Sequence, residues 1–276
     1  MPPKVVSYSA AAYYDVDVFA DAGSPTYPLS VQVSVSATTS MKSTSTAIPC
    51  MNFVGFHTDS RITLINQGII EGKGGAGGNA VVWWGFSFPL GTYRDWYISG
   101  SGGGGAGCDT ASAGLTADPA VYVAGTRGID GSSKTAGAGG IRDTSPPFLI
   151  DPPPDDGIRW DWIGPNVPKG VGIQAESGGD AIRLGESDIQ IYNAGAFLLG
   201  GGGGGAGGTS QAFFTTGDGW AGGANGESGE DVFDPFAQDF RNTGGDGGFA
   251  IRYAGAGTAF IIDGFTPPNV EGQIGA

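Results

Sequence analysis

The sequence has 276 residues, of which 39% are hydrophobic, and its 15 Phe, 9 Tyr and 6 Trp are enough to build a core. The 54 glycines and 17 prolines therefore do not by themselves predict disorder, because disordered chains are poor in aromatic residues. A formal net charge of −14 disfavours nucleic acid as a partner.

No stretch is long and apolar enough to cross a membrane, and the first residues lack the apolar core of a secretory signal. We therefore expect the protein to be made in a cytoplasm and not to insert into a membrane. The two cysteines, Cys50 and Cys108, are too few for a disulfide framework or a metal knuckle, so we expect free, buried thiols.

The N-terminal part of the chain has the pattern of strands. Residues 4–20 and 29–37 alternate apolar and polar side chains, as at Tyr14, Val16 and Val18, which indicates strands with one buried face. The Gly- and Pro-containing sequence between them favours a turn. We predict a small all-β unit over residues 1–70.

One stretch occurs twice. Residues 61–78 (RITLINQGIIEGKGGAGG) and residues 188–208 (DIQIYNAGAFLLGGGGGGAGG) both place a strand-like run before an Asn-x-Gly turn, an apolar pair and a glycine tract. Ile62 corresponds to Ile189, an offset of 127 residues. We interpret each copy as a strand that leads into a glycine tract.

The glycine tracts lack the side chains that a strand packs, but glycine can take a left-handed extended helix with three residues per turn. Such helices approach closely enough to hydrogen-bond sideways. For residues 71–276 we predict a polyglycine-II helix bundle, or sandwich, with long aromatic loops; flexible glycine linkers are the alternative. No helical periodicity spans three turns, so we expect an all-β or irregular chain with almost no α-helix.

Several motifs follow one another in a recognisable order. SMKSTSTAIP (residues 40–49) precedes the strand RITLIN (residues 61–66), its Asn-x-Gly turn and the tract at 72–78. GGDAIRLGE (residues 178–186) and GGFAIRYAG (residues 247–255) share a second motif, and the chain closes on VEGQIG. In this order the motifs resemble the glycine-rich domain of tail-tip and tail-fibre proteins of tailed bacteriophages, although Ala254 stands where that family has Asn.

The resemblance implies a protein of the phage tail, hence of the virion, that is made in the host cytoplasm and displays loops to a receptor, protein or glycan, on the bacterial surface. It implies other phage tail proteins as partners and, by analogy with tail fibres, a homotrimer. We expect no cofactor. No long β-helical or coiled-coil shaft is evident, so we expect a small tip or accessory protein whose N-terminal unit attaches to the tail or oligomerises.

Aromatic residues are concentrated between the tracts, and such residues dominate protein interfaces. The alternative role for them is to cover the glycine lattice, which has no side chains of its own. The positions predicted to contact a receptor are Trp83, Trp84, Trp96, Phe213, Phe214, Trp220, Phe233, Phe236 and Phe240.

The proline-rich segment at residues 143–170 is expected to be an extended arm. Trp160 and Trp162 are its predicted anchors, for docking to a neighbouring subunit or tail protein or, equally, to a receptor.

Catalytic and metal-binding patterns are weak. The chain has one histidine, no G-x-S-x-G motif and no acidic cluster with the spacing of a calcium loop, so we expect no catalytic, cofactor-binding or metal-binding residues. Two carboxylates would suffice for a glycosidase, which keeps a glycan depolymerase as a distant alternative. The main alternative to an adhesin is a purely architectural virion protein of the tail tip, collar or head.

Overall fold

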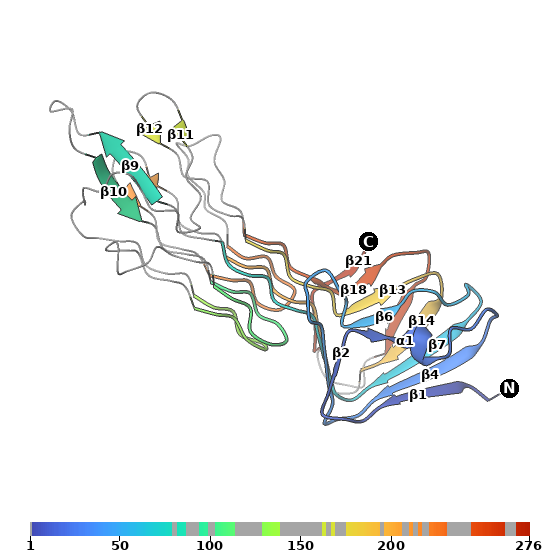
Figure 1. The fold of residues 1–276 in the computed structure, drawn as a ribbon. Helices are drawn as coiled ribbons and strands as arrows, with labels where there is room; N and C mark the ends of the chain where they lie inside the picture. Colours follow the sequence, from blue (N-terminus) through green and yellow to red (C-terminus); the bar gives the residue numbers. More distant parts are fainter. Residues whose placement is uncertain are drawn as a thin grey trace.

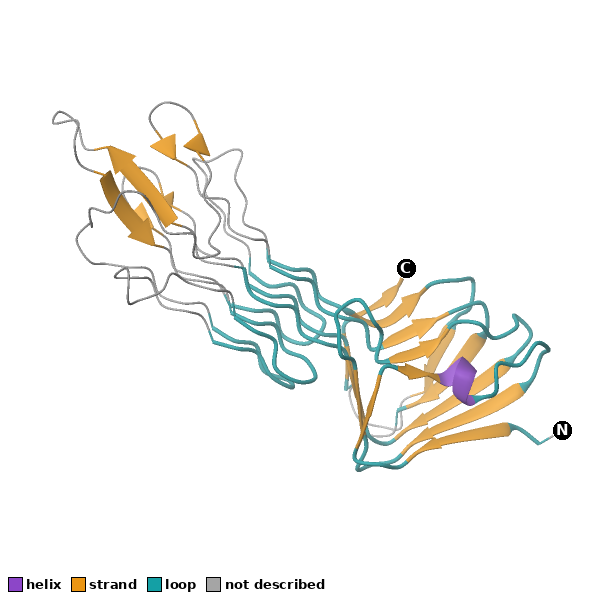
Figure 2. Ribbon diagram, viewed as in Figure 1, coloured by secondary structure: helices purple, strands orange, loops and turns teal. Residues whose placement is uncertain are grey.

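The computed structural model describes residues 2–78, 103–113, 129–138, 175–193, 196–205, 221–230, 244–261 and 269–276, and the backbone alone of Ile262 and of six short strands at 82–86, 94–98, 162–163, 167–168, 210–211 and 215–216. Within these residues the chain is strand and extended loop, with one helical turn, α1 (Val18–Asp21) (Figure 2). Asp17 caps that turn by accepting a hydrogen bond from the Ala20 amide. For the described residues, the prediction of an almost helix-free, nearly all-β chain is confirmed.

Three five-stranded sheets, each wholly parallel, form one end of the molecule (Figure 1). The first sheet contains, in spatial order, β1 (Lys4–Tyr8), β4 (Ser30–Val35), β7 (Arg61–Asn66), β14 (Asp188–Tyr192) and β19 (Ala259–Ile262). The second contains β2 (Ala12–Tyr14), β5 (Ser40–Lys42), β8 (Ile69–Glu71), β15 (Phe197–Leu199) and β20 (Val270–Glu271). The third contains β3 (Val16–Asp17), β6 (Met51–Phe53), β13 (Ile182–Leu184), β18 (Phe249–Tyr253) and β21 (Gln273–Gly275).

The chain visits the three sheets in turn, so its strands wind as a three-sided parallel β-helix. The five coils are β1–β2–β3, β4–β5–β6, β7–β8–β13, β14–β15–β18 and β19–β20–β21. At the corner between β2 and β3 the backbone of Asp15 has φ 48°, and the turn there leaves Tyr14 50% exposed while Val16 is buried. The alternation read through Tyr14, Val16 and Val18 is thus interrupted by a corner.

The β unit differs from the predicted one at residues 1–70. Strands from residues 182–199 and 249–275 complete the sheets that residues 4–71 begin. The predicted boundary at residue 70 therefore does not separate the β unit from the rest of the chain. The physical reason is that β6, β7 and β8 are inner strands, whose backbone groups need partners on both sides.

The core lies inside the β-helix and follows the period-two pattern. Val33, Leu64 and Ile191 lie side by side in register and are each fully buried. The side chains next to them along each strand point outward, as the exposed side chain of Gln190 does. Coil stacking thus gives each strand one apolar and one polar face.

The sequence repeat corresponds to stacked coils. Strand β7 pairs with β14 in the register Ile62↔Ile189, the same offset of 127 residues. The two turn asparagines are buried and stacked, since Asn66 Nδ2 donates to Asn193 Oδ1 over 2.7 Å. The second recurring motif behaves likewise, because β13 pairs with β18 with Ile182 opposite Ile251.

Two long excursions leave the β-helix at one corner. Residues 72–181 connect β8 to β13 and residues 200–248 connect β15 to β18, so both run from the second sheet to the third. Their described glycine tracts extend side by side away from the β-helix (Figure 1).

The tract at residues 199–205 lies at the centre of these tracts. Each amide from Gly200 to Gly205 donates to another segment: the acceptors are, in order, the carbonyl oxygens of Glu271, Gly179, Ala106, Glu227, Glu176 and Gly103. Its carbonyl groups accept from the amides of Gly72, Gly248, Gly75, Gly223, Gly245 and Gly78. The same neighbouring segment recurs every third residue at five positions around this tract. The sixth position is shared by two segments, because Gly200 donates to Glu271 and Gly203 donates to Glu227.

Candidate functional site

The tracts alternate in direction, and this fixes where the chain between them is attached. Gly72, Gly75 and Gly78 donate to Leu199, Gly202 and Gly205, so these two tracts run outward together. The tracts at 103–108, 175–180 and 244–248 run back, since Gly201 bonds Gly179 whereas Gly204 bonds Glu176. We call the end of the tracts remote from the β-helix the distal end.

Five connecting segments begin and end at the distal end. They are residues 79–102, 114–128, 139–174, 206–220 and 231–243. At the opposite, proximal end the described connections are the turns near Asp109, Lys134 and Gly226, each with a positive φ, and the strands of the β-helix itself. All six tryptophans of the sequence lie in the five connecting segments.

Three short hairpins lie together at the distal end (Figure 1). They pair β9 (Val82–Phe86) with β10 (Arg94–Ile98), β11 (Trp162–Ile163) with β12 (Val167–Pro168) and β16 (Ser210–Gln211) with β17 (Thr215–Thr216). β12 lies beside β9, and β17 lies beside β10. Segments far apart in the sequence thus meet here.

The predicted receptor-binding and docking residues all belong to these segments. Trp83 and Trp84 are on β9, opposite Tyr97 and Trp96 of β10, and Trp162 begins β11; only their backbone is described. The other predicted positions lie outside the described residues: Trp160, Phe213, Phe214, Trp220, Phe233, Phe236 and Phe240.

A buried carboxylate ties the proximal end together. Glu71, only 1% exposed, accepts hydrogen bonds from Ser133 Oγ at 2.7 Å, the Lys134 amide at 3.0 Å and Asn225 Nδ2 at 3.1 Å. Asn225 also donates to the carbonyl group of Gly200. Two proximal turns are therefore attached to the end of β8. No sequence pattern predicts this attachment, because Glu71 reads as an ordinary polar residue after an apolar pair.

A second buried carboxylate, Asp180, lies where the chain re-enters the third sheet. It is 3% exposed, forms ion pairs with Arg252 Nε at 2.7 Å and Arg183 Nη2 at 3.3 Å, and accepts a hydrogen bond from the Phe249 amide. The Arg252 contact is ionic and too bent for a hydrogen bond. Asp180 and Glu71 are each saturated by protein groups, which is the behaviour of structural carboxylates.

The thiols of Cys50 and Cys108 are free and buried, as predicted. Burial raises the pKa of both thiols, which keeps them protonated and unreactive at neutral pH. Among the described residues no three metal-ligating side chains gather, and no described helix is long and apolar enough to cross a membrane.

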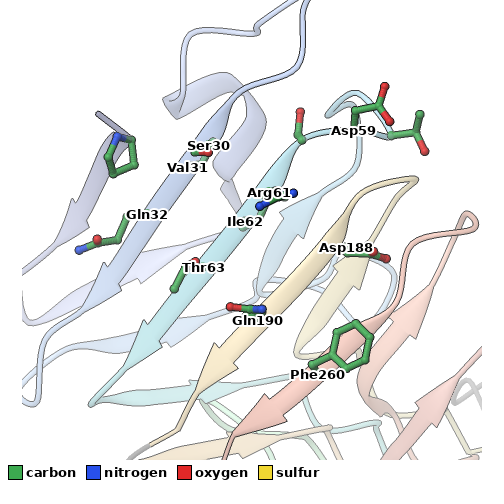
Figure 3. A pocket seen from close by; sticks show the side chains of 13 residues that line it. Ser30, Val31, Gln32, Asp59, Arg61, Ile62, Thr63, Asp188, Gln190 and Phe260 are labelled. Carbon is green, nitrogen blue, oxygen red and sulfur yellow. The ribbon is translucent and has the colours of Figure 1, made fainter. Parts of the chain in front are cut away.

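The outer face of the first sheet has a hollow of about 710 Å³ (Figure 3). Polar side chains line it, among them Gln32, Thr63 and Gln190, together with the exposed ring of Phe260. These side chains are the outward-facing members of the alternating strands. The period-two pattern therefore predicts that each points outward, but it does not predict that they share one face.

No family model and no curated protein matches this sequence. Among solved structures, the chain is similar to the gp37-gp38 adhesin tip complex of the bacteriophage S16 long tail fiber, with 11% sequence identity and a TM-score of 0.42. The similarity covers 99% of this chain and 82% of that chain. At this level of identity and TM-score, the function has to be inferred from the geometry of the chain.

Proposed function

We propose that this protein is a tail-tip or tail-fibre adhesin of a bacteriophage, which attaches to other tail proteins through its β-helix and contacts a bacterial surface receptor through its distal end. The observation that carries the proposal is that five connecting segments, which hold all six tryptophans, begin and end at the same end of a hydrogen-bonded bundle of tracts. Binding loops held by a rigid scaffold are the usual arrangement for recognition. The motifs at residues 40–78 and 247–275 supply the resemblance to phage tail proteins.

The scaffold of the proposal is a polyglycine-II bundle. Three features of the tracts support it: partners that recur every third residue, six neighbouring positions around the tract at 199–205, and the absence of room for side chains between tracts. A Cβ on Gly203 or Gly204 would overlap the carbonyl oxygen of Gly245 or Ala76. With a rise of about 3.1 Å per residue, six steps from residue 199 to 205 separate the distal end from the β-helix by about 19 Å.

The proposal is of a non-enzymatic protein. A purely architectural role would need the β-helix but no receptor, and a depolymerase would need a carboxylate pair with catalytic spacing. The parallel β-helix does not by itself favour the depolymerase, because fold does not specify chemistry. The clustering of aromatic segments at the distal end favours the adhesin over both.

Adsorption to cells tests the proposal. Fluorescently labelled protein is incubated with a panel of bacterial isolates, and an isolate that binds it is challenged with the variants Trp220→Ala and Phe236→Ala. We expect at least about a tenfold loss of affinity for one or both, because aromatic anchors contribute most of the energy of an interface.

Tyr27→Ala is the matched control, since Tyr27 is an exposed aromatic residue, 64% accessible, on the β-helix. Equal loss for Tyr27→Ala, or undiminished binding by both distal variants, would contradict the adhesin. Co-assembly with tail proteins without binding to any isolate would establish the architectural role. Release of sugar from host polysaccharide would establish the depolymerase.

A further inference from the structure

The outer face of the first sheet presents a straight row of side chains across all five strands. The strand registers place Val5, Gln32, Thr63, Gln190 and Phe260 opposite one another, one residue per coil. Adjacent strands are about 4.8 Å apart, so the row is about 19 Å long. It runs perpendicular to the strands, along the axis of the β-helix.

The polar members of this row have no hydrogen-bond partner among the described residues. Within the described part of the chain, no hydrogen bond reaches the side chains of Gln32, Thr63 or Gln190, and Gln190 is exposed. The next row toward β2 differs, because Ser34 Oγ donates to Ser7 Oγ. Two amide groups and one hydroxyl group are therefore available for a ligand.

The hollow follows this row from Gln32 to Phe260 (Figure 3). Its volume of about 710 Å³ lies in the range of about 300–1,000 Å³ typical of ligand sites. The ring of Phe260, 57% exposed, closes one end, and Asp188 and Arg61 border the row on the side away from β2. Asp188 and Arg61 offset each other's charge, and the protein as a whole is strongly negative.

We propose that this face binds an extended chain of neutral sugar residues that lies across the strands. A pyranose ring in an extended chain is about as long as the strand spacing, so successive rings would meet successive coils. Amides and hydroxyls exchange hydrogen bonds with sugar hydroxyls, and an exposed aromatic ring stacks on the apolar face of a pyranose. The absence of net positive charge on this face disfavours polyanionic glycans.

This site is separate from the distal end and does not rest on the adhesin proposal. The row needs only the β-helix, whereas the proposed receptor contact needs the connecting segments. A variant that loses one activity and keeps the other therefore distinguishes them.

Calorimetric titration of the full chain with cellohexaose, maltohexaose and laminarihexaose, and with glucose, tests the site. We expect at least one hexasaccharide to bind at least about tenfold more tightly than glucose, because several coils contribute contacts. Gln190→Ala and Phe260→Ala should each weaken that binding by about five- to tenfold.

The matched controls are Gln273→Ala and Ile274→Ala, because both residues are exposed on β21 of the third sheet. Thermal unfolding of all four variants verifies that they fold. Failure of every hexasaccharide to bind would overturn the proposal, as would binding that the row variants and the controls affect equally. Capture of a tail protein by this face, with loss of capture in Gln190→Ala, would assign the face to a protein partner and would also overturn it.

Discussion

Gly203 lies in the middle of the central tract, where its amide donates to Glu227 and its carbonyl group accepts from Gly223. A methyl group at Gly203 would occupy the position of the Gly245 carbonyl oxygen, so the two tracts would have to separate. Glycine at this position is required by the close approach of another backbone, since its φ lies outside the left-handed region.

Gly203→Ala should therefore destabilise the protein by at least about 3 kcal/mol, from overpacking and from broken backbone hydrogen bonds. The measurement is chemical unfolding followed by intrinsic fluorescence. Gly275→Ala is the control, because a Cβ there would find only an ordinary contact with Phe249. Equal stability of the two variants would show that the tracts are not closely packed.

Asp188 supplies a pH-dependent contribution to stability. Its carboxylate accepts hydrogen bonds from Thr258 Oγ1 at 2.7 Å and from the Thr258 amide at 2.9 Å, and the side-chain bond is the main reason that its pKa is lowered. A group with a lowered folded pKa stabilises the protein above its unfolded pKa of about 3.9 and loses that contribution as the pH falls through the folded pKa.

Asp188→Ala should accordingly lower the thermal midpoint slightly at pH 7, because the carboxylate is exposed and solvent screens it. The difference from the parent protein should shrink as the pH falls below about 4. Thermal unfolding at pH 7, 4 and 3 measures this. A difference that stays constant or grows toward low pH would contradict the assignment.

At the scale of elements, the hairpin at residues 131–135 depends on β8. Its turn is attached through Ser133 and Lys134 to the buried carboxylate of Glu71. Ala in place of Glu71 would remove the acceptor of all three donors.

Glu71→Ala should destabilise the hairpin by about 1–3 kcal/mol, because the donors that Glu71 binds would lose their acceptor. Hydrogen exchange at the amides of Ser132 and Thr135, which bond each other's carbonyl groups, reports it. Glu176→Ala, at an exposed side chain, should leave the exchange unchanged. Unaltered exchange in both variants would show that Glu71 does not hold the hairpin.

Elements with a local pattern were predictable from the sequence. The alternation in residues 29–37 identified β4. The 127-residue repeat equals the register offset of β7 on β14, although the pairing of the two copies was not predicted. The partners of the other strands were not predictable, because alternation identifies the buried face of a strand but not its neighbour. Strands such as β13 and β21 have three residues, too few to show a period.

Only part of the candidate site was predictable from the sequence. Aromatic density between glycine tracts indicated the connecting segments, whereas the row through Gln32, Thr63 and Gln190 exists only because coils far apart in sequence stack. No local pattern contains that information.

For the whole molecule, the interleaving of the β-helix predicts that its N-terminal part does not fold alone. A fragment of residues 1–71 contains β1 to β8 but lacks β13, β14 and β15, the partners of β6, β7 and β8. It would expose one apolar end of the core and unpaired strand edges.

We expect the fragment to be aggregated or unfolded by circular dichroism and to lack a cooperative thermal transition, whereas the full chain unfolds cooperatively. A soluble fragment with a sharp transition would instead support an independent N-terminal unit at residues 1–70.

The return of each excursion to the β-helix also has a mechanical consequence. Tension applied at the distal end enters the β-helix at four points, after Glu71, before Ala181, after Leu199 and before Phe249. Between those points the tracts lie along the pulling direction, so their mutual hydrogen bonds are loaded in shear and share the force. A tether built this way resists stretching through many bonds at once.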